Sequence, residues 1–179
     1  MKNTFIHLVC ASLMLIFSFS FAQSDEEETG LKSVLNGFSF RSVGPAFMSG
    51  RIADIAIDPT NENVWYVAVG SGGTWKTMNA GTTWTPLTDD ESFYSTGCIT
   101  LDPSNSSVVW LGTGENVGGR HVGIGHGIYR STDGGSSWQD MGLKQSEHIS
   151  KIIVHPNDSN IIWVASQGPL WSSGGERGL

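Results

Sequence analysis

Two octapeptides decide the fold: TMNAGTTW at residues 77–84 and STDGGSSW at residues 131–138. Both fit the pattern S/T-x-D/N-x-G-x-S/T-W. In such a hairpin the Asp or Asn side chain accepts hydrogen bonds from the turn amides, and the Gly takes the positive φ that the turn requires. The final Trp is a large apolar side chain that can pack between neighbouring sheets. The octapeptides therefore predict two similar β-hairpins.

The octapeptides lie at the same phase of a longer repeat. One copy covers residues 51–84, a second covers residues 96–138, and a third begins at Ile149 and is not complete at Leu179. Between residues 110 and 129 the second copy has about ten extra residues, judged by the shift in repeat spacing. A repeat of roughly 40 to 50 residues, built from short strands, is typical of β-propeller blades.

Each copy divides into four strands. In the first copy, alternation at residues 52–57 predicts one strand, and the Asp-Pro turn at residues 58–61 reverses the chain. Residues 64–68 form a mostly apolar second strand, residues 75–77 begin a third, and Trp84 marks the fourth. We therefore expect an all-β fold with about two complete four-stranded blades plus part of a third.

Such a chain is an incomplete propeller, because a closed ring normally needs four to eight blades. An N-terminal fragment or a truncated gene product explains this, and the remaining blades of the same propeller would then be a partner. Self-association that completes the ring is the alternative.

The first residues predict export. A basic start, an apolar run at residues 5–21 and small residues before a cut after Ala22 describe a signal peptide at residues 1–22. A membrane span is the alternative, although the run is at the lower length limit for spanning. Residues 23–37 form an acidic leader, and residues 38–179 form the propeller part of a secreted protein.

Charge and cysteine content narrow the classes of partner. The net charge is −7, which argues against nucleic acid and anionic membranes, since both need clustered Lys and Arg. Cys98 is the only cysteine outside the signal peptide, so the mature chain has no intrachain disulfide. Its flanking residues indicate a strand, and we expect a core thiol.

At this point the motifs resemble a known group. The octapeptides resemble Asp-boxes, and FRSVGPAFMSGRIADIAIDP at residues 40–59, SGGTWKT, GTGEN and GGERGL are similar to BNR-repeat propellers of the sortilin N-terminal-like bacterial "glycosyl hydrolase" group. The resemblance implies the propeller fold for residues 38–179. It also implies structural roles for the Asp-box residues Thr77, Asn79, Gly81, Trp84, Ser131, Asp133, Gly135 and Trp138.

Binding residues are expected on the other face of the propeller, where long loops gather. The candidates for ligand binding are Arg51, Glu115, Arg120, His121, His126, Glu176 and Arg177. Arginine forks suit the carboxylate of a peptide or an acidic sugar; alternatively, each Arg pairs with a nearby acid and fixes its loop. The spacing of the two histidines is poor for a metal, so we expect no metal and no cofactor.

Two functions remain open. One is a secreted, non-catalytic module that binds a peptide, protein or glycan at its central mouth. The other is the N-terminal part of a glycoside hydrolase, which needs two carboxylates roughly 5 to 10 Å apart. Glu115 is the catalytic candidate, with Asp89, Asp90 or Glu176 as its partner. Related xyloglucanase propellers carry a catalytic Asp after an early second strand, where this chain has residues 69–72 without a carboxylate. We expect the fragment alone to be inactive.

Overall fold

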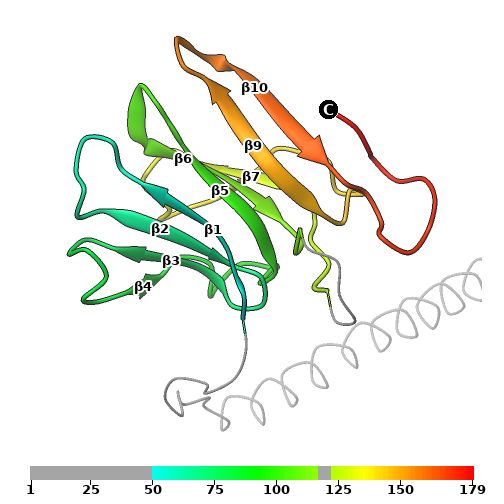
Figure 1. Ribbon diagram of the computed structural model, residues 1–179, viewed down its shortest axis with the longest axis horizontal. Coiled ribbons are helices and arrows are strands. Elements are labelled where there is room, and N and C mark those ends of the chain that lie inside the picture. Colours follow the sequence, from blue (N-terminus) through cyan, green and yellow to red (C-terminus); the bar gives the residue numbers. More distant parts are fainter. Residues whose placement is uncertain (1–49, 117–121) are drawn as a thin grey trace, which may run out of the picture. The chain divides into compact units, whose positions relative to one another are not determined.

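The computed structural model describes residues 50–116 and 122–179 (Figure 1). The expected signal peptide, the acidic leader and the candidates Arg120 and His121 lie outside the described residues. The described ranges contain ten β-strands. No helix within them is long and apolar enough to pass through a membrane.

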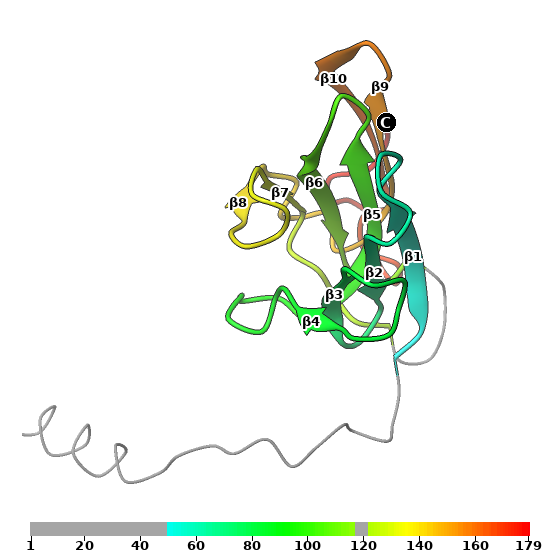
Figure 2. The ribbon, with the colours of Figure 1, turned by 90° about the vertical axis from the view of Figure 1, so that its left-hand side faces the viewer.

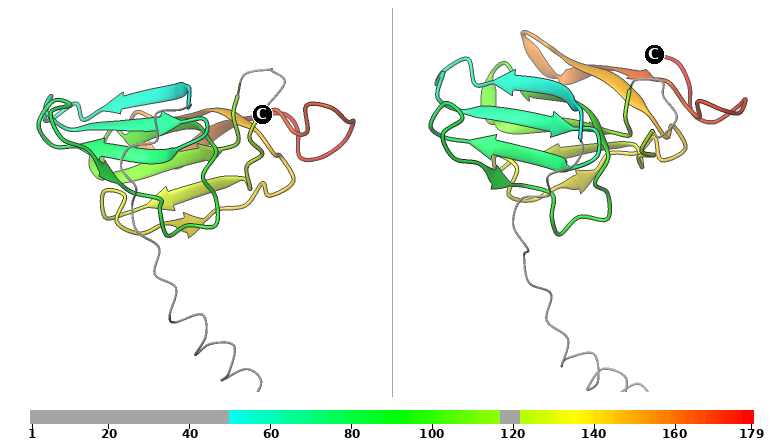
Figure 3. Two further views of the ribbon diagram at one scale, coloured as in Figure 1. Left: turned by 90° about the horizontal axis from the view of Figure 1, so that it is seen from below. Right: turned by 60° about the horizontal axis from the view of Figure 1, so that its bottom comes forward.

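The strands form three antiparallel sheets, confirming the all-β prediction. The first blade contains β1 (Ile52–Ile57), β2 (Trp65–Val69), β3 (Gly73–Thr77) and β4 (Thr85–Pro86). The second contains β5 (Thr96–Asp102), β6 (Asn105–Thr113), β7 (Ile128–Ser131) and β8 (Gln139–Asp140). The third contains β9 (Ile149–His155) and β10 (Asp158–Ser166). Both complete sheets keep their strands in chain order, and Figure 3 shows them stacked on each other.

The third blade also shows the start of a further strand. Ser166 and Gly178 form an antiparallel bridge, in which each N–H donates to the other carbonyl at 2.9 and 3.0 Å. This bridge occupies the place of the Val69 and Gly73 pair in the first blade. The two complete blades and the unfinished third one therefore follow one plan.

The first strands of the three blades lie side by side, whereas β4 and β8 lie at the far edges of their sheets (Figure 2). The Asp54 carboxylate in β1 joins all three inner strands. Its Oδ2 accepts the backbone N–H of Ile99 in β5 at 3.2 Å and the Lys151 Nζ of β9 at 2.9 Å. The sheets therefore share an inner side, as propeller blades do.

Apolar cores fill the space between successive blades. Tyr66 and Ala68 of the first blade pack with Val109 and Leu111 of the second. The other core packs Cys98, Val108, Trp110 and Ile128 against Ile149, Ile152 and Val154. Burial raises the pKa of the Cys98 thiol to about 12, with the Asp54 charge adding to the effect. The expected core position of this cysteine is confirmed.

The octapeptide hairpins have matching hydrogen bonds. Ser131 Oγ donates to Asp133 Oδ1 at 2.7 Å and accepts the Gly135 N–H at 2.8 Å. Asp133 Oδ1 also accepts the Ser137 N–H at 2.9 Å. Residues 77–84 repeat these three bonds at 3.0, 2.9 and 2.8 Å, with Asn79 in place of the aspartate. The prediction of two similar hairpins is confirmed.

The Asp133 carboxyl predicts a measurable acid effect. Hydrogen bonds from Ser137 and Ser131 lower its pKa to about 2. Because the folded pKa lies below the unfolded value near 3.9, this group stabilises the fold above that value. That contribution is lost as the pH falls from about 4 towards 2. We expect a carboxyl ¹³C titration to place the Asp133 midpoint near 2.

Asn79 supplies the matched control for this titration. We expect Asp133→Asn to lose less stability than the wild type between pH 4 and 2.5, measured by urea unfolding. The reverse change, Asn79→Asp, should add a second carboxyl with a similarly low pKa, because its hydrogen-bond partners are the same. An Asp133 midpoint near 4 would contradict this account.

The two octapeptide tryptophans have different surroundings. Trp138 packs on the core between the first two blades, and its Nε1 donates to the Leu87 carbonyl at 3.1 Å. Trp84 contacts Trp65 of its own blade, with ring centroids 6.5 Å apart, and is 39% exposed. The prediction that the Trp packs between sheets is confirmed for Trp138. Trp84 instead lies on the outer face of the first blade, which is the face that points away from the second blade.

Candidate functional site

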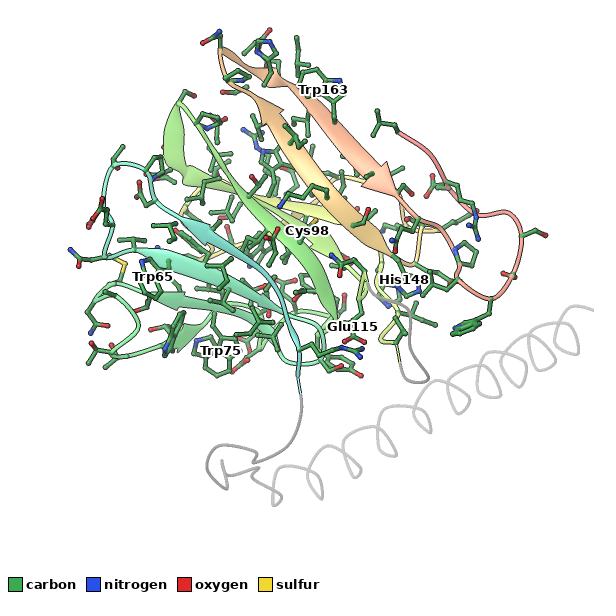
Figure 4. The ribbon with its side chains drawn as sticks, in the orientation of Figure 1. Trp65, Trp75, Cys98, Glu115, His148 and Trp163 are labelled. Carbon is green, nitrogen blue, oxygen red and sulfur yellow. The ribbon has the colours of Figure 1, made fainter. Side chains whose placement is uncertain are left out.

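The candidate site lies around Glu115 (Figure 4), on the face opposite the octapeptide hairpins. Arg51 forms an ion pair with Glu115 there. Arg51 lies just before β1 and Glu115 shortly after β6, so the pair joins two blades. Arg51 Nε and Nη2 donate to Glu115 Oε1 at 3.0 and 2.6 Å. The Gly123 N–H donates to Glu115 Oε2 at 2.9 Å. Both oxygens of this buried carboxylate therefore accept hydrogen bonds.

Gly70 makes room for this carboxylate. A Cβ at residue 70 would lie 2.3 Å from Glu115 Oε1, too close for any real contact. The Ser95 hydroxyl donates to the Gly70 carbonyl at 2.8 Å and ties the same loop to the second blade. The Glu115 carboxylate thus occupies the space that a side chain of the first-blade loop would fill.

His148 continues the polar seam towards the third blade and lies near Glu115 in Figure 4. Its Nδ1 lies 2.8 Å from the Glu115 carbonyl. Because a carbonyl only accepts, Nδ1 carries the hydrogen, which leaves Nε2 as an acceptor in the neutral ring. Burial lowers the His148 pKa, so the ring is neutral at pH 7. Gln167 Nε2 donates to the Asn116 carbonyl at 3.3 Å and adds a link to the third blade.

The other candidates are held separately. His126 has an exposed side chain, and its backbone N–H donates to Thr113 Oγ1 at 2.7 Å. Glu176 Oε2 accepts the Gln145 N–H at 3.0 Å. Arg177 bonds to carbonyls of its own loop, those of Pro169, Ser172 and Gly174. Among the candidate arginines within the described residues, Arg51 pairs with an acidic side chain, whereas Arg177 bonds to backbone carbonyls.

The acidic residues proposed as partners of Glu115 have other neighbours. Asp89 and Asp90 line a groove of about 370 Å³ together with Gly135 and Ser136 of the second hairpin. Within residues 50–116 and 122–179, no three His, Cys, Asp or Glu side chains are grouped as a metal site.

Sequence reasoning did not single out Gly70 or Gly123. Gly70 matters because it has no side chain, and Gly123 because its backbone N–H donates a hydrogen bond. Nothing in the sequence distinguishes these two from the other glycines of the chain, which has 23 in all.

Comparison of the sequence with known proteins gives similarity to xyloglucanases. No family model matches the chain. The xyloglucanase Xgh74A of Acetivibrio thermocellus is 27% identical over 145 residues, covering 73% of this chain and 17% of the relative. The xyloglucanase of Hypocrea jecorina is 33% identical over 113 residues, covering 51% of this chain and 13% of the relative. The chain spans less than a fifth of the length of these relatives.

Solved structures support the fold. The GH74 enzyme of Niastella koreensis aligns with a TM-score of 0.52 and 24% identity over 68% of this chain and 18% of that chain. An ancestral GH74 enzyme aligns with a TM-score of 0.52 and 20% identity, over 64% and 16% of the two chains. The chain is thus similar to β-propeller glycoside hydrolases. The two relatives with similar sequences given above are xyloglucanases. The resemblance to the sortilin-like group stays a prediction.

Proposed function

We propose that this chain is part of a secreted glycoside hydrolase that acts on a β-glucan polysaccharide such as xyloglucan. The observation that carries the proposal is the 27% identity to a xyloglucanase over 73% of the chain. The fold agrees with it, because the four-stranded sheets of this chain belong to the same kind of fold as a GH74 enzyme that aligns with 68% of the chain. Export rests on the apolar run at residues 5–21 and the small residues that follow it.

In this proposal Glu115 is a positioning residue. Glycoside hydrolysis needs a carboxylic acid that gives a proton to the leaving oxygen and a second carboxylate across the bond. Both Glu115 oxygens already accept N–H bonds from Arg51 and Gly123. A carboxylate held in this way is suited to orienting the Arg51 guanidinium, which is 52% exposed. We infer that the catalytic pair comes from other parts of the whole protein and that this chain alone is inactive.

A binding module is the second candidate function. The half-exposed Arg51 favours it, because a fixed guanidinium on a loop face can donate to oxygen atoms of a peptide or glycan. The remaining blades of the propeller, with Asp-box hairpins like those described, would then cover the exposed Ile55, Ile57 and Trp84.

The test is reducing-end release by the whole protein from xyloglucan, with starch as the control polysaccharide. We expect release from xyloglucan and none from starch. Glu115→Gln should lower the rate about tenfold, because it weakens the hold on Arg51 without removing a reacting group.

Asp140→Asn is the matched variant for this assay, because Asp140 is an exposed acid that pairs with Lys144 at the edge of the second blade. It should leave the rate unchanged. Absence of new reducing ends from xyloglucan and other β-glucans would overturn the hydrolase proposal. Complete loss of activity in Glu115→Gln would instead give Glu115 a direct catalytic role.

A further inference from the structure

Trp171 is the most exposed tryptophan of the chain. Its side chain is 80% exposed, whereas Trp110 is 4% exposed and Trp163, on the outer face of the third blade, is 40% exposed. An indole has a large apolar area, and leaving it in water forgoes the free energy that its burial would provide. Among the tryptophans, Trp171 therefore offers the largest indole surface to a ligand.

The loop that carries Trp171 is internally fixed. Arg177 donates to the carbonyls of Ser172 at 2.7 Å, Gly174 at 3.0 Å and Pro169, on both sides of the tryptophan. A Cβ at Gly175 would lie 2.5 Å from Pro169 Cδ, so the loop is also tightly packed. One guanidinium thus organises the backbone around an indole that remains outside.

The base of this loop is attached to the candidate site. The Gln167 N–H donates to the His148 carbonyl at 2.9 Å, and its side chain reaches the carbonyl of Asn116. His148 in turn bonds to Glu115, the partner of Arg51. Trp171 therefore belongs to the same face of the blades as the Arg51 and Glu115 pair.

We propose that Trp171 is a stacking platform for a pyranose ring of the polysaccharide. This inference rests on the proposed function and names the part of the site that holds the sugar. A β-linked pyranose presents C–H bonds on its flat face and hydroxyl groups around its rim. The flat face covers the indole, while the rim stays in water or meets polar groups such as the exposed Ser172 and Ser173. A loop fixed in advance loses little freedom when the sugar binds.

The first experiment follows the indole N–H signals of ¹⁵N-labelled chain by NMR during titration with a xyloglucan oligosaccharide. The chain has seven tryptophans, and Trp171→Phe identifies the Trp171 signal. We expect this signal to shift most, while the signal of buried Trp110 stays in place. A Trp171 signal that does not respond when the oligosaccharide binds would overturn the proposal.

The second experiment measures the dissociation constant by calorimetry. Trp171→Ala should weaken oligosaccharide binding about tenfold, and Trp171→Phe should weaken it less because an aromatic face remains. Met78→Ala is the matched control, since Met78 is 63% exposed on the opposite face. This variant should bind the oligosaccharide with the same dissociation constant as the wild type. Circular dichroism checks that each variant is folded.

The outcomes separate the two proposals. Oligosaccharide binding that Trp171→Ala leaves unchanged overturns the stacking role and leaves the hydrolase proposal standing. Binding lost equally in Trp171→Ala and Met78→Ala overturns the stacking role as well. Absence of binding by the wild-type chain overturns the stacking role, whereas the hydrolase proposal is decided by reducing-end release from the whole protein. If the fluorescence of Trp171 were protected from acrylamide quenching in the absence of sugar, polypeptide would cover the indole. That result would also refute the stacking role.

Discussion

Trp138→Ala is expected to lower the free energy of unfolding by about 3 kcal/mol, the usual cost of removing a large aromatic side chain from a packed site. Trp138 packs on the core between the first and second blades and donates to the Leu87 carbonyl. Its loss leaves a cavity between the sheets and an unpaired carbonyl. Urea unfolding followed by far-UV circular dichroism measures the change.

Trp84→Ala is the matched variant, because Trp84 ends the other octapeptide. Its indole is 39% exposed and contacts Trp65 of its own blade. We therefore expect a loss of about 1 kcal/mol, since less apolar area is removed from water there. Equal losses in the two variants would show that Trp138 gains nothing from the neighbouring blade.

Arg51→Ala is expected to cost about 2 kcal/mol of unfolding free energy. It leaves the Glu115 carboxylate, which is 2% exposed, with the hydrogen bond from the Gly123 N–H. Removing one partner of a fully buried pair costs about 3–5 kcal/mol. Because the Arg51 side chain is half exposed, water can reach Glu115 after its removal, and the expected loss is smaller. Lys151→Ala is the control: Lys151 is similarly exposed, but its partner Asp54 is 20% exposed. We expect a loss below about 1 kcal/mol for that variant.

Gly70→Ala tests the same contact from the other side. The added methyl group would meet Glu115 Oε1, so we expect a loss of about 1–3 kcal/mol from overpacking. In a Glu115→Ala background the same change should cost little, because the colliding atoms are absent. Equal costs of Gly70→Ala in both backgrounds, measured by urea unfolding, would refute the described contact.

The strands could be predicted from the sequence because their signals are local. Alternation at residues 52–57 gave the bounds of β1, and the octapeptides gave both hairpins. The fourth strand was expected at Trp84, whereas β4 begins at Thr85 and has two residues. Trp84 itself lies at the end of the hairpin, against Trp65, so it precedes the paired residues.

The sequence could predict which residues belong to the candidate site, but it could not predict which of them contact one another. Arg51 and Glu115 are 64 residues apart, and no local pattern states that their loops meet. The expectation that arginines pair with acids holds for Arg51, where a buried carboxylate is available. Arg177 instead bonds to carbonyls of residues 169–174, and backbone acceptors have no sequence signature. Glycines that admit a neighbouring side chain are hidden for the same reason.

The shared carboxylate of Asp54 has a consequence for changes in loop length. The strands β1, β5 and β9 lie together along one side of the sheets, and the Asp54 carboxylate joins them there, apart from the connections between second and third strands. The corresponding connections already differ in length, at residues 70–72, 114–127 and 167–177. A change in the length of these connections would therefore leave the contacts of Asp54 with β5 and β9 in place.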